Sequence, residues 1–258
     1  ALLNLKLPFK IKEEFKEDSF WYNFKLKTPT LNNPILKTKK IKTGVNSYNK
    51  GGYLLIKEVN NTTLLKTPFI KFRAAQNDLL HLDIWHKGYN ILMDTGSYLY
   101  NTDELTSMSF NGVLGHNTAS LNGNNHMLKG PRFTWLYKPK FLSSEIYEYE
   151  DKYKIVASML VSYPKKYIIN RTLIKYKNSD VWEVEDFVSE GMCVKDKLFQ
   201  FWNLAMDIPC KVELIQAGNV KRTEEIGYES LYYGNKTPIN KIILSTNSSI
   251  LKVKIKIL

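Results

Sequence analysis

The sequence predicts an all-β protein, a large antiparallel β-sandwich. Short apolar and aromatic runs recur roughly every 8–15 residues and are separated by turn residues such as Asn-Gly and Glu-Gly. Apolar and polar residues alternate cleanly at 153–158 and 252–258, which is typical of strands with one face in the core and one in water. No long segment repeats its apolar residues with the 3.6-residue period of a helix.

The chain in order begins with a different composition from the rest. Residues 1–24 open weakly helical, and Pro8 ends that pattern before a charged stretch. Residues 25–50 are rich in Lys, Asn, Thr and Pro, which predicts an extended linker with short strand pieces. We therefore expect a short helical remnant and linker over 1–50 and a β domain over 51–258. The predicted strands after the Gly51-Gly52 turn are 53–59, 67–75, 78–85, 89–94, 116–122, 133–137, 143–150, 153–163, 167–176, 181–189, 198–205, 210–217, 229–234, 240–246 and 250–258.

The net charge of +12 favours a polyanion as partner, either nucleic acid, an anionic membrane or an acidic polysaccharide. The lysines are spread singly or in pairs, so a Lys and Asn bias from an AT-rich coding sequence explains the charge equally well. Arginines are few and no nucleic-acid-binding module is recognisable, which argues against nucleic acid. No run of about 18 apolar residues is present, so no transmembrane helix is expected.

Motifs exclude several enzyme classes. The sequence lacks GxSxG, GxxxxGK[ST], GxGxxG and HExxH, the motifs of α/β-hydrolases, P-loop proteins, dinucleotide-binding enzymes and zinc proteases. Cys193 and Cys210 are the only cysteines. They could form one disulfide, but they do not indicate a compartment.

Residues 73–118 hold most of the side chains suited to chemistry, including His81, His86 and His116. If 73–85 is a strand, its polar residues gather at one end, where they either reach a cleft or simply meet solvent. His81 and Asp83 then share a face. A carboxylate beside an imidazole orients it and raises its basicity. The alternative is a buried, mutually satisfied pair.

Asp94 and His116 are the strongest individual candidates. Asp94 ends an apolar strand before a Gly turn, so it either accepts backbone N–H groups there or serves as a hard metal ligand. His116 follows a glycine and precedes a predicted strand. The two could share a metal if a third ligand is supplied. His126 lies in an Asn-rich turn and is expected at the surface.

Four ordered blocks resemble the C-terminal β domain of the heparinase II/III-like polysaccharide lyases, a superfamily that includes alginate lyases. They are QNDLLHLDIW (76–85), NILMDTGSYLYN (90–101), GHNTASLNG (115–123) and GPRFTW (130–135). The resemblance implies a sandwich of the supersandwich type, joined in the whole protein to an N-terminal α/α toroid that we expect to be missing from this chain. It also implies β-elimination on a uronic-acid-containing acidic polysaccharide. We expect the chain alone to be inactive, because of Ala74, Gln76 and the missing toroid.

The resemblance places the family's metal ligands at Gln76, Asp94 and His116. Gln76 stands where the family has histidine, and an amide is a poor zinc ligand, so a divalent metal, zinc or calcium, is an open expectation. The family's catalytic histidine falls on Ala74, which cannot move a proton. His116 and His81 remain the catalytic candidates. The expected substrate-binding residues are Arg73, Gln76, Tyr98, Asn117 and Arg132.

A second reading of these departures is a non-catalytic protein. A block with Gln in place of the histidine resembles a branch associated with bacterial surface-polysaccharide systems. The alternative function is therefore a carbohydrate-binding module or an accessory protein of surface-polysaccharide biosynthesis. A periplasmic, extracellular or cell-surface location is favoured in either case.

Overall fold

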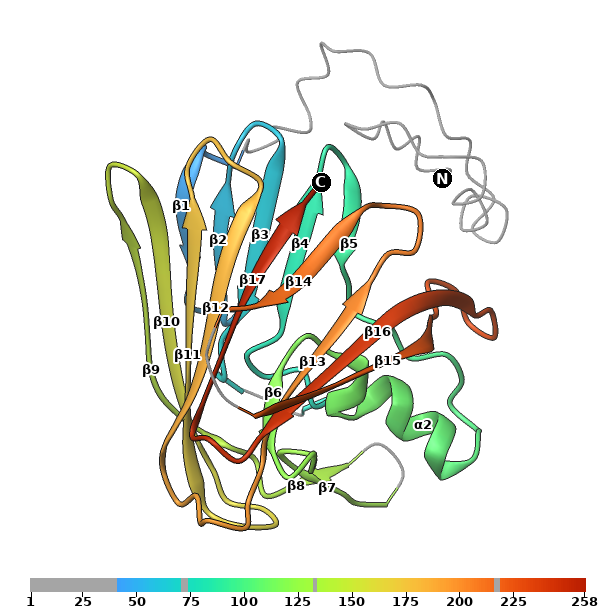
Figure 1. Cartoon of the computed structure of the whole chain (residues 1–258). Coiled ribbons are helices and arrows are strands. Elements are labelled where there is room, and N and C mark those ends of the chain that lie inside the picture. Colours follow the sequence, from blue (N-terminus) through green and yellow to red (C-terminus); the bar gives the residue numbers. More distant parts are fainter. Residues whose placement is uncertain (1–40, 71–73, 132–133, 216–218) are drawn as a thin grey trace, which may run out of the picture. The chain divides into compact units, whose positions relative to one another are not determined.

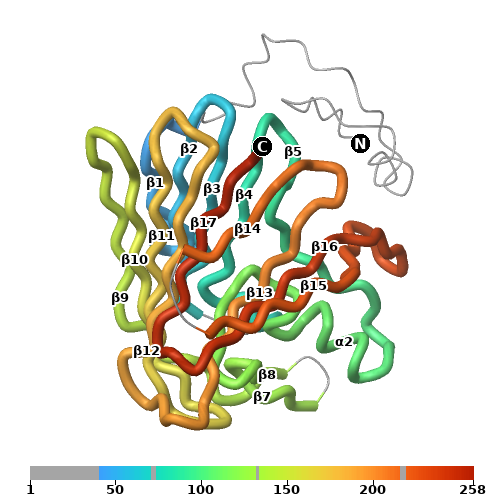
Figure 2. Tube along the Cα trace, in the orientation of Figure 1, coloured from blue at the N-terminus to red at the C-terminus, as the bar shows by residue number. Residues whose placement is uncertain are grey.

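The computed structural model describes residues 41–70, 74–131, 134–215 and 219–258 (Figures 1 and 2). The predicted helical remnant and most of the linker lie outside these ranges. The folded β unit begins at Lys42. Its first strand, β1, lies within the segment expected to be a linker with short strand pieces, so the sheet begins before residue 51.

The larger sheet holds nine strands among the described residues. Its order is β1-β2-β3-β4-β5-β13-β16-β15, and β6 pairs with β13. All these pairs are antiparallel. The strands are β1 (Gly44–Tyr48), β2 (Tyr53–Lys57), β3 (Asn61–Lys66), β4 (Leu82–His86), β5 (Tyr89–Leu92), β6 (Ala119–Leu121), β13 (Leu198–Leu204), β15 (Val220–Glu229) and β16 (Thr237–Thr246).

A second sheet of six antiparallel strands has the order β14-β17-β12-β11-β10-β9 within the described ranges. A small ribbon pairs β7 (Leu128–Lys129) with β8 (Trp135–Leu136). The six strands are β9 (Lys140–Glu148), β10 (Lys152–Val161), β11 (Tyr167–Tyr176), β12 (Val181–Glu190), β14 (Cys210–Leu214) and β17 (Ile250–Ile257).

The core lies between the two sheets, which face each other in Figure 1. Every second residue of β11 is buried, as the alternation of its sequence requires for a strand with one face in the core. The apolar cluster joins residues of both sheets, such as Ile84 and Leu173. The indole N–H of Trp182 also donates to Thr63 Oγ1 across the sandwich, at 2.9 Å. The predicted all-β antiparallel sandwich is confirmed.

One helix was not predicted, and the strands β3, β7 and β15 lie almost entirely outside the predicted strand ranges. The helix α2 (Glu104–Asn111) begins after Asp103, whose carboxylate accepts the N–H of Thr106 at 2.8 Å, a standard N-cap. The helix spans only eight residues and fully buries only Phe110, so it has little apolar periodicity to detect. A 3₁₀ turn follows at Val113–Gly115. The strand predicted at 67–75 is wrong among its described residues, because β3 ends at Lys66.

The strand predicted at 73–85 is also wrong over its first half, because β4 begins only at Leu82. The N–H of His81 donates to Asp78 O at 3.3 Å and closes a turn. Leu80 within this turn has a φ of +59°, a left-handed conformation that ends the alternation of faces. Leu79 and Leu80 are consequently both buried, and His81 enters the core from a turn.

The structure also answers two smaller questions. Cys193 and Cys210 are not bonded to each other, and Cys193 is exposed. None of the helices formed by the described residues is long and apolar enough to cross a membrane.

Candidate functional site

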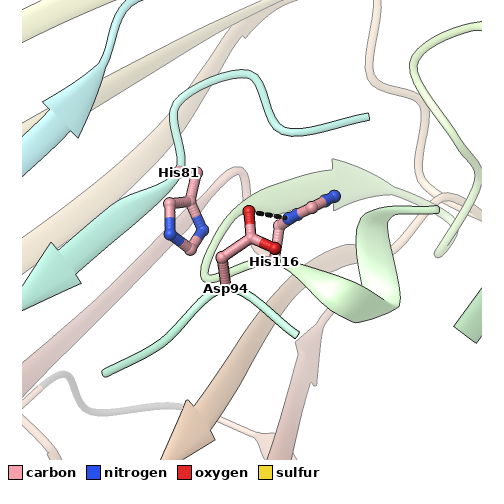
Figure 3. Close-up of side chains that lie close together, drawn as sticks. All are labelled: His81, Asp94 and His116. Carbon is pink, nitrogen blue, oxygen red and sulfur yellow. Dashed lines mark ion pairs between the residues drawn. The ribbon is translucent and has the colours of Figure 1, made fainter. Parts of the chain in front are cut away.

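Asp94 and His116 meet where β5 and the 3₁₀ turn end (Figure 3). His116 Nδ1 lies 3.1 Å from Asp94 Oδ2. The other carboxylate oxygen, Oδ1, accepts the N–H of Gly96 at 2.8 Å, as expected for an Asp before a Gly turn. The side chain of His116 is fully buried, whereas that of Asp94 is 37% exposed. Only the carboxylate of this pair is therefore open to a ligand.

His81 is the third member of the cluster. His81, Asp94 and His116 each offer a ligand atom, and these atoms lie within 4.8 Å of one another. The two imidazole rings are nearly perpendicular, with centroids 5.6 Å apart. The structure thus brings together the two residues with the strongest sequence signal. It adds His81, where the sequence had led us to expect Gln76.

A backbone contact determines the tautomer of the neutral His81 ring. The N–H of Asn117 donates to His81 Nδ1 at 2.9 Å, so Nδ1 must carry the lone pair and Nε2 the proton of the neutral ring. Nε2 lies 3.9 Å from Asp83 Oδ2, which is too long for a hydrogen bond. The expected proximity of His81 and Asp83 is present. Asn117, rather than Asp83, determines the tautomer.

Opposing effects act on the pKa of Asp94. Burial raises it, but the neighbouring His116, then His81 and the Gly96 N–H, lower it, and together they hold the pKa well below its usual range. Asp94 is therefore ionised throughout the neutral range. A carboxylate of this kind is a good hydrogen-bond acceptor and a poor proton acceptor.

The residues do not fit the metal that the resemblance implies. A neutral imidazole has one free lone pair, and that of His81 already accepts the Asn117 N–H. Gln76 directs its amide nitrogen to Gly96 O, Ser97 Oγ and Asn111 Oδ1, at 3.2, 3.1 and 3.3 Å. Asp94 and His116 alone fall short of the three or four protein ligands of zinc sites. We derive no step through a metal.

A cavity of about 600 Å³ opens beside the turn at residues 94–97, which we call the Asp94 turn. Its volume falls in the range of small-molecule sites, roughly 300–1,000 Å³. Asp94 and His116 do not line it, but Gln76 and Ser97 do, next to Gly96. One wall comes from α2, the helix that the sequence did not predict. Residues that line the cavity include Ala74, Gln76, Ser97, Tyr100, Asn111 and Lys129.

The other expected substrate-binding residues are placed as follows. Asn117 is fully buried: its amide nitrogen donates to Leu82 O and Met93 O, and its amide oxygen accepts the Asn203 N–H. This places Asn117 among the groups that hold the fold rather than on a substrate-facing surface. Tyr98 is half-buried and stacks on Phe110, with ring centroids 5.3 Å apart. Arg73 and Arg132 lie outside the described residues.

Sequence reasoning missed a buried ion pair behind the site. Arg171 donates from Nε and Nη2 to the two carboxylate oxygens of Asp186, at 2.8 and 2.7 Å, and both side chains are fully buried. Its Nη1 donates to Leu80 O and Asn117 O, both at 2.6 Å. The pair therefore connects the six-stranded sheet to the segment that holds His81 and His116. Arg171 and Asp186 are directly opposite in the β11–β12 register, so only a predicted register could have revealed them.

The expectation that His126 lies at the surface is wrong. His126 is fully buried, and its Nε2–H donates to Ala119 O at 2.8 Å. Burial lowers the pKa of its imidazole to about 4, so the ring is neutral at neutral pH. The Asn-rich turn around it is held against the core by hydrogen bonds such as the one that the Met127 N–H donates to the Asn77 side chain at Oδ1, 3.0 Å long.

These features define an antiparallel β-sandwich domain with a histidine–aspartate cluster at the ends of its central strands. The family model described as "Heparinase II/III-like, C-terminal" matches residues 40–195, which is more than half of the chain. The chain belongs to this family, as the four sequence blocks indicated.

Solved structures agree on the fold. A heparinase III superposes with a TM-score of 0.65 at 14% identity, covering 83% of this chain and 36% of that one. The heparan sulfate lyase HepC from Pedobacter heparinus gives a TM-score of 0.63 at 17% identity, covering 93% and 38%. The chain therefore spans little more than a third of the length of these structures. No curated protein sequence matches the chain significantly.

Proposed function

We propose that this chain is the β domain of a lyase that cleaves a uronic-acid-containing acidic polysaccharide by β-elimination, and that it supplies a substrate-binding face rather than the proton-transfer groups. Family membership supports the lyase class. The observation that carries the division of roles is the Asp94–His116 pair, in which the partly exposed member is a carboxylate with a lowered pKa and the imidazole is buried.

β-Elimination needs a base at the C5 proton of the uronic acid and an acid at the leaving oxygen. Each must come within hydrogen-bond distance of its proton. His116 is fully buried and His81 is nearly so. The resemblance to the family implies that Ala74 stands in place of its catalytic histidine. We therefore assign the base, and the group that neutralises the uronate carboxylate, to an α/α toroid domain. The greater length of the similar heparinases supports that assignment.

Asp94 suits a binding role because its ionised carboxylate accepts hydrogen bonds from sugar hydroxyls. Charge-assisted hydrogen bonds of this kind are about twice as strong as neutral ones. The carboxylates of an acidic polymer are repelled by Asp94 itself. They are attracted by the overall charge of +12 and by lysines near the cavity, such as Lys129.

The activity claim is tested by incubating the chain with alginate, heparan sulfate and glucuronan and following the absorbance of the unsaturated uronate product. We expect no product from the chain alone. Product formation that disappears in the His116→Ala variant would contradict the proposal, because it would show that this domain transfers protons by itself.

The binding claim is tested with Asp94→Asn, which removes the charge and keeps the shape. We expect weaker binding of the acidic polysaccharide at near-neutral pH. Asp180→Asn is the matched control, since Asp180 is also a half-exposed carboxylate, 42% exposed, and lies 3.5 Å from His86. Equal losses in both variants would contradict a specific role for Asp94.

A second candidate function is a non-catalytic carbohydrate-binding or surface-polysaccharide accessory module. Ala74 and Gln76 favour it, because Ala74 is packed against Met127 and Trp135 and the Gln76 amide is engaged by its neighbours. This function predicts saturable binding that survives Asp94→Ala and His116→Ala. Both functions place the protein where such polymers occur, at the cell surface, in the periplasm or outside the cell.

A further inference from the structure

Four tyrosines, three of them exposed, gather beside the Asp94 turn. We call Tyr98, Tyr100, Tyr228, Tyr233 and Lys236 the tyrosine shelf. Tyr100 and Tyr233 are 71% and 66% exposed, and their ring centroids lie 5.3 Å apart. Lys236 Nζ lies 4.8 Å from the Tyr98 ring centroid and 5.0 Å from that of Tyr228. A contiguous group of exposed aromatic rings marks a binding surface more often than scattered apolar residues do.

Backbone contacts lock the two loops that carry the shelf. The N–H of Ser230 donates to Thr95 O at 2.8 Å, and that of Gly234 donates to Tyr98 O at 3.0 Å. A Cβ at Gly96 would lie 2.2 Å from Ser230 O, and Gly96 has a φ of +80°, so only glycine allows this approach. The shelf is therefore preorganised, and a ligand loses less free energy in ordering it.

The shelf is continuous with the cavity. Tyr100 belongs to the shelf and also lines the cavity. Ser97 and Gln76 line the cavity beside it. Gly96, whose N–H donates to Asp94, links the two, because its carbonyl oxygen accepts the Gln76 amide and its backbone pairs with Ser230. A chain-like ligand bound in the cavity would consequently extend onto the rings of Tyr100 and Tyr233.

The composition of the shelf points to a sugar acid. Pyranose rings present an apolar C–H face that packs on an aromatic ring, and tyrosine adds a hydroxyl for the sugar hydroxyls. Among the described residues Lys236 has no ion-pair partner, so its charge is available to a carboxylate or sulfate. Lysine is depleted in the cores of protein–protein interfaces, which disfavours a protein as the occupant.

We propose that the tyrosine shelf is an extended subsite for an acidic polysaccharide, in which Tyr100 and Tyr233 stack on sugar rings and Lys236 pairs with the acidic group. This inference rests on the proposed function, since it specifies how the same substrate continues beyond Asp94. It does not require that the chain catalyse elimination.

The test is affinity electrophoresis of the chain in gels containing heparan sulfate, alginate or neutral dextran. Tyr233→Ala and Lys236→Ala are expected to weaken binding of the acidic polymers about three- to tenfold each, the usual value of one aromatic or cation contact. Dextran should retard neither the wild type nor the variants.

The six-stranded sheet provides matched controls. Tyr149 is an exposed tyrosine whose ring lies 6.3 Å from that of Tyr147, and Lys152 Nζ lies 5.9 Å from the Tyr149 ring centroid. Tyr149→Ala and Lys152→Ala therefore remove the same ring and the same charge elsewhere. Both should bind acidic polymers like the wild type. Equal losses in shelf and control variants would overturn the proposal, because they would show non-specific attraction by net charge.

The remaining outcomes are also decisive. Wild-type binding by both shelf variants, with unchanged melting temperatures, would overturn the shelf. A dimer in light scattering that Tyr233→Ala dissociates, without any loss of glycan binding, would assign the shelf to a second copy of the chain instead. If Asp94→Asn binds normally while the shelf variants do not, the shelf stands and the binding role of Asp94 fails. If no acidic polymer binds, both proposals fail.

Discussion

Two pairs of a basic and an acidic side chain lie close to Asn117 and differ in how completely their hydrogen-bonding groups are satisfied. In the Arg171–Asp186 pair both side chains are fully buried, and Asp186 also accepts a hydrogen bond from Gln200 Nε2 at 2.8 Å. In the Asp94–His116 pair the carboxylate is partly exposed, and neither ring nitrogen of His116 makes a hydrogen bond of good geometry to a described residue.

The difference separates stability from binding. A buried ion pair with all its partners holds neighbouring strands in one arrangement. Removal of one member leaves the other charge buried without a partner. A pair with unused capacity at the surface contributes less to the fold but can accept a ligand. Asn117 connects the two, because it follows His116 in the chain and its carbonyl oxygen accepts a hydrogen bond from Arg171.

The largest expected effect comes from breaking the satisfied pair. Arg171→Met leaves Asp186 buried without its counter-charge, so the free energy of unfolding should fall by about 3–5 kcal/mol. Urea denaturation followed by tryptophan fluorescence measures this. The control Glu224→Gln breaks the exposed Arg222–Glu224 pair, 2.6 Å apart, and should cost less than about 1 kcal/mol. Similar losses in both would remove the distinction between the two kinds of pair.

His126 tests whether the burial of a titratable group without a counter-charge makes the free energy of unfolding depend on pH. Its pKa is about 4 in the folded state against 6.5 for the free group. The unfolded chain therefore binds more protons between these values, and stability should fall as the pH drops from about 6.5 to 4, by about 3 kcal/mol in total. Unfolding free energies at several pH values check this. His126→Gln should flatten the curve in that range, and an unchanged curve would assign the dependence to other groups.

Asn117→Ala should have an intermediate effect. It removes the side-chain bonds to Leu82 O, Met93 O and the Asn203 N–H in the core, so we expect a loss of about 1–3 kcal/mol. Asn46→Ala is the control, because Asn46 also donates to two backbone carbonyls, at 2.8 and 3.2 Å, but near the surface where water replaces them. Thermal melts of the two variants should differ clearly, and equal losses would argue against a structural role for Asn117.

The smallest expected effect concerns metal. Zinc or calcium added to chelator-treated protein should not raise the melting temperature, because His81 lacks a free lone pair while it accepts the Asn117 N–H. A ligand bound only by the folded state would raise it. A metal-dependent rise that Asp94→Ala abolishes would show that this hydrogen bond gives way to a metal, and that the unsatisfied pair is a metal site after all.

The sequence predicted the fold well in strands whose apolar and polar residues alternate. Alternation along β10, β11 and β17 reports directly which face is buried, so these strands and the sandwich were recognised. The helix α2 escaped notice because it buries too little apolar surface to create a period. The strand at 73–85 was over-extended because nothing in its composition signals that Leu80 adopts a positive φ.

The site was predicted in part. Asp94 and His116 meet because each ends an element, and the family blocks mark both positions. His81 could not be placed, since its entry into the cluster depends on the turn at Asp78–His81. The Arg171–Asp186 pair depends on strand register. The tyrosine shelf depends on contact between loops more than a hundred residues apart. No local sequence pattern predicts either feature.

The close approach of Gly96 to Ser230 also has a consequence for how the protein is made and how it varies. A ribosome synthesises the chain from its N-terminus, so the Asp94 turn cannot take its final form until the β15–β16 hairpin has emerged. That hairpin lies beyond the family-matched residues 40–195. Side-chain changes in the hairpin that keep the contact of Ser230 with Gly96 would therefore change the proposed subsite while leaving the Asp94 turn intact.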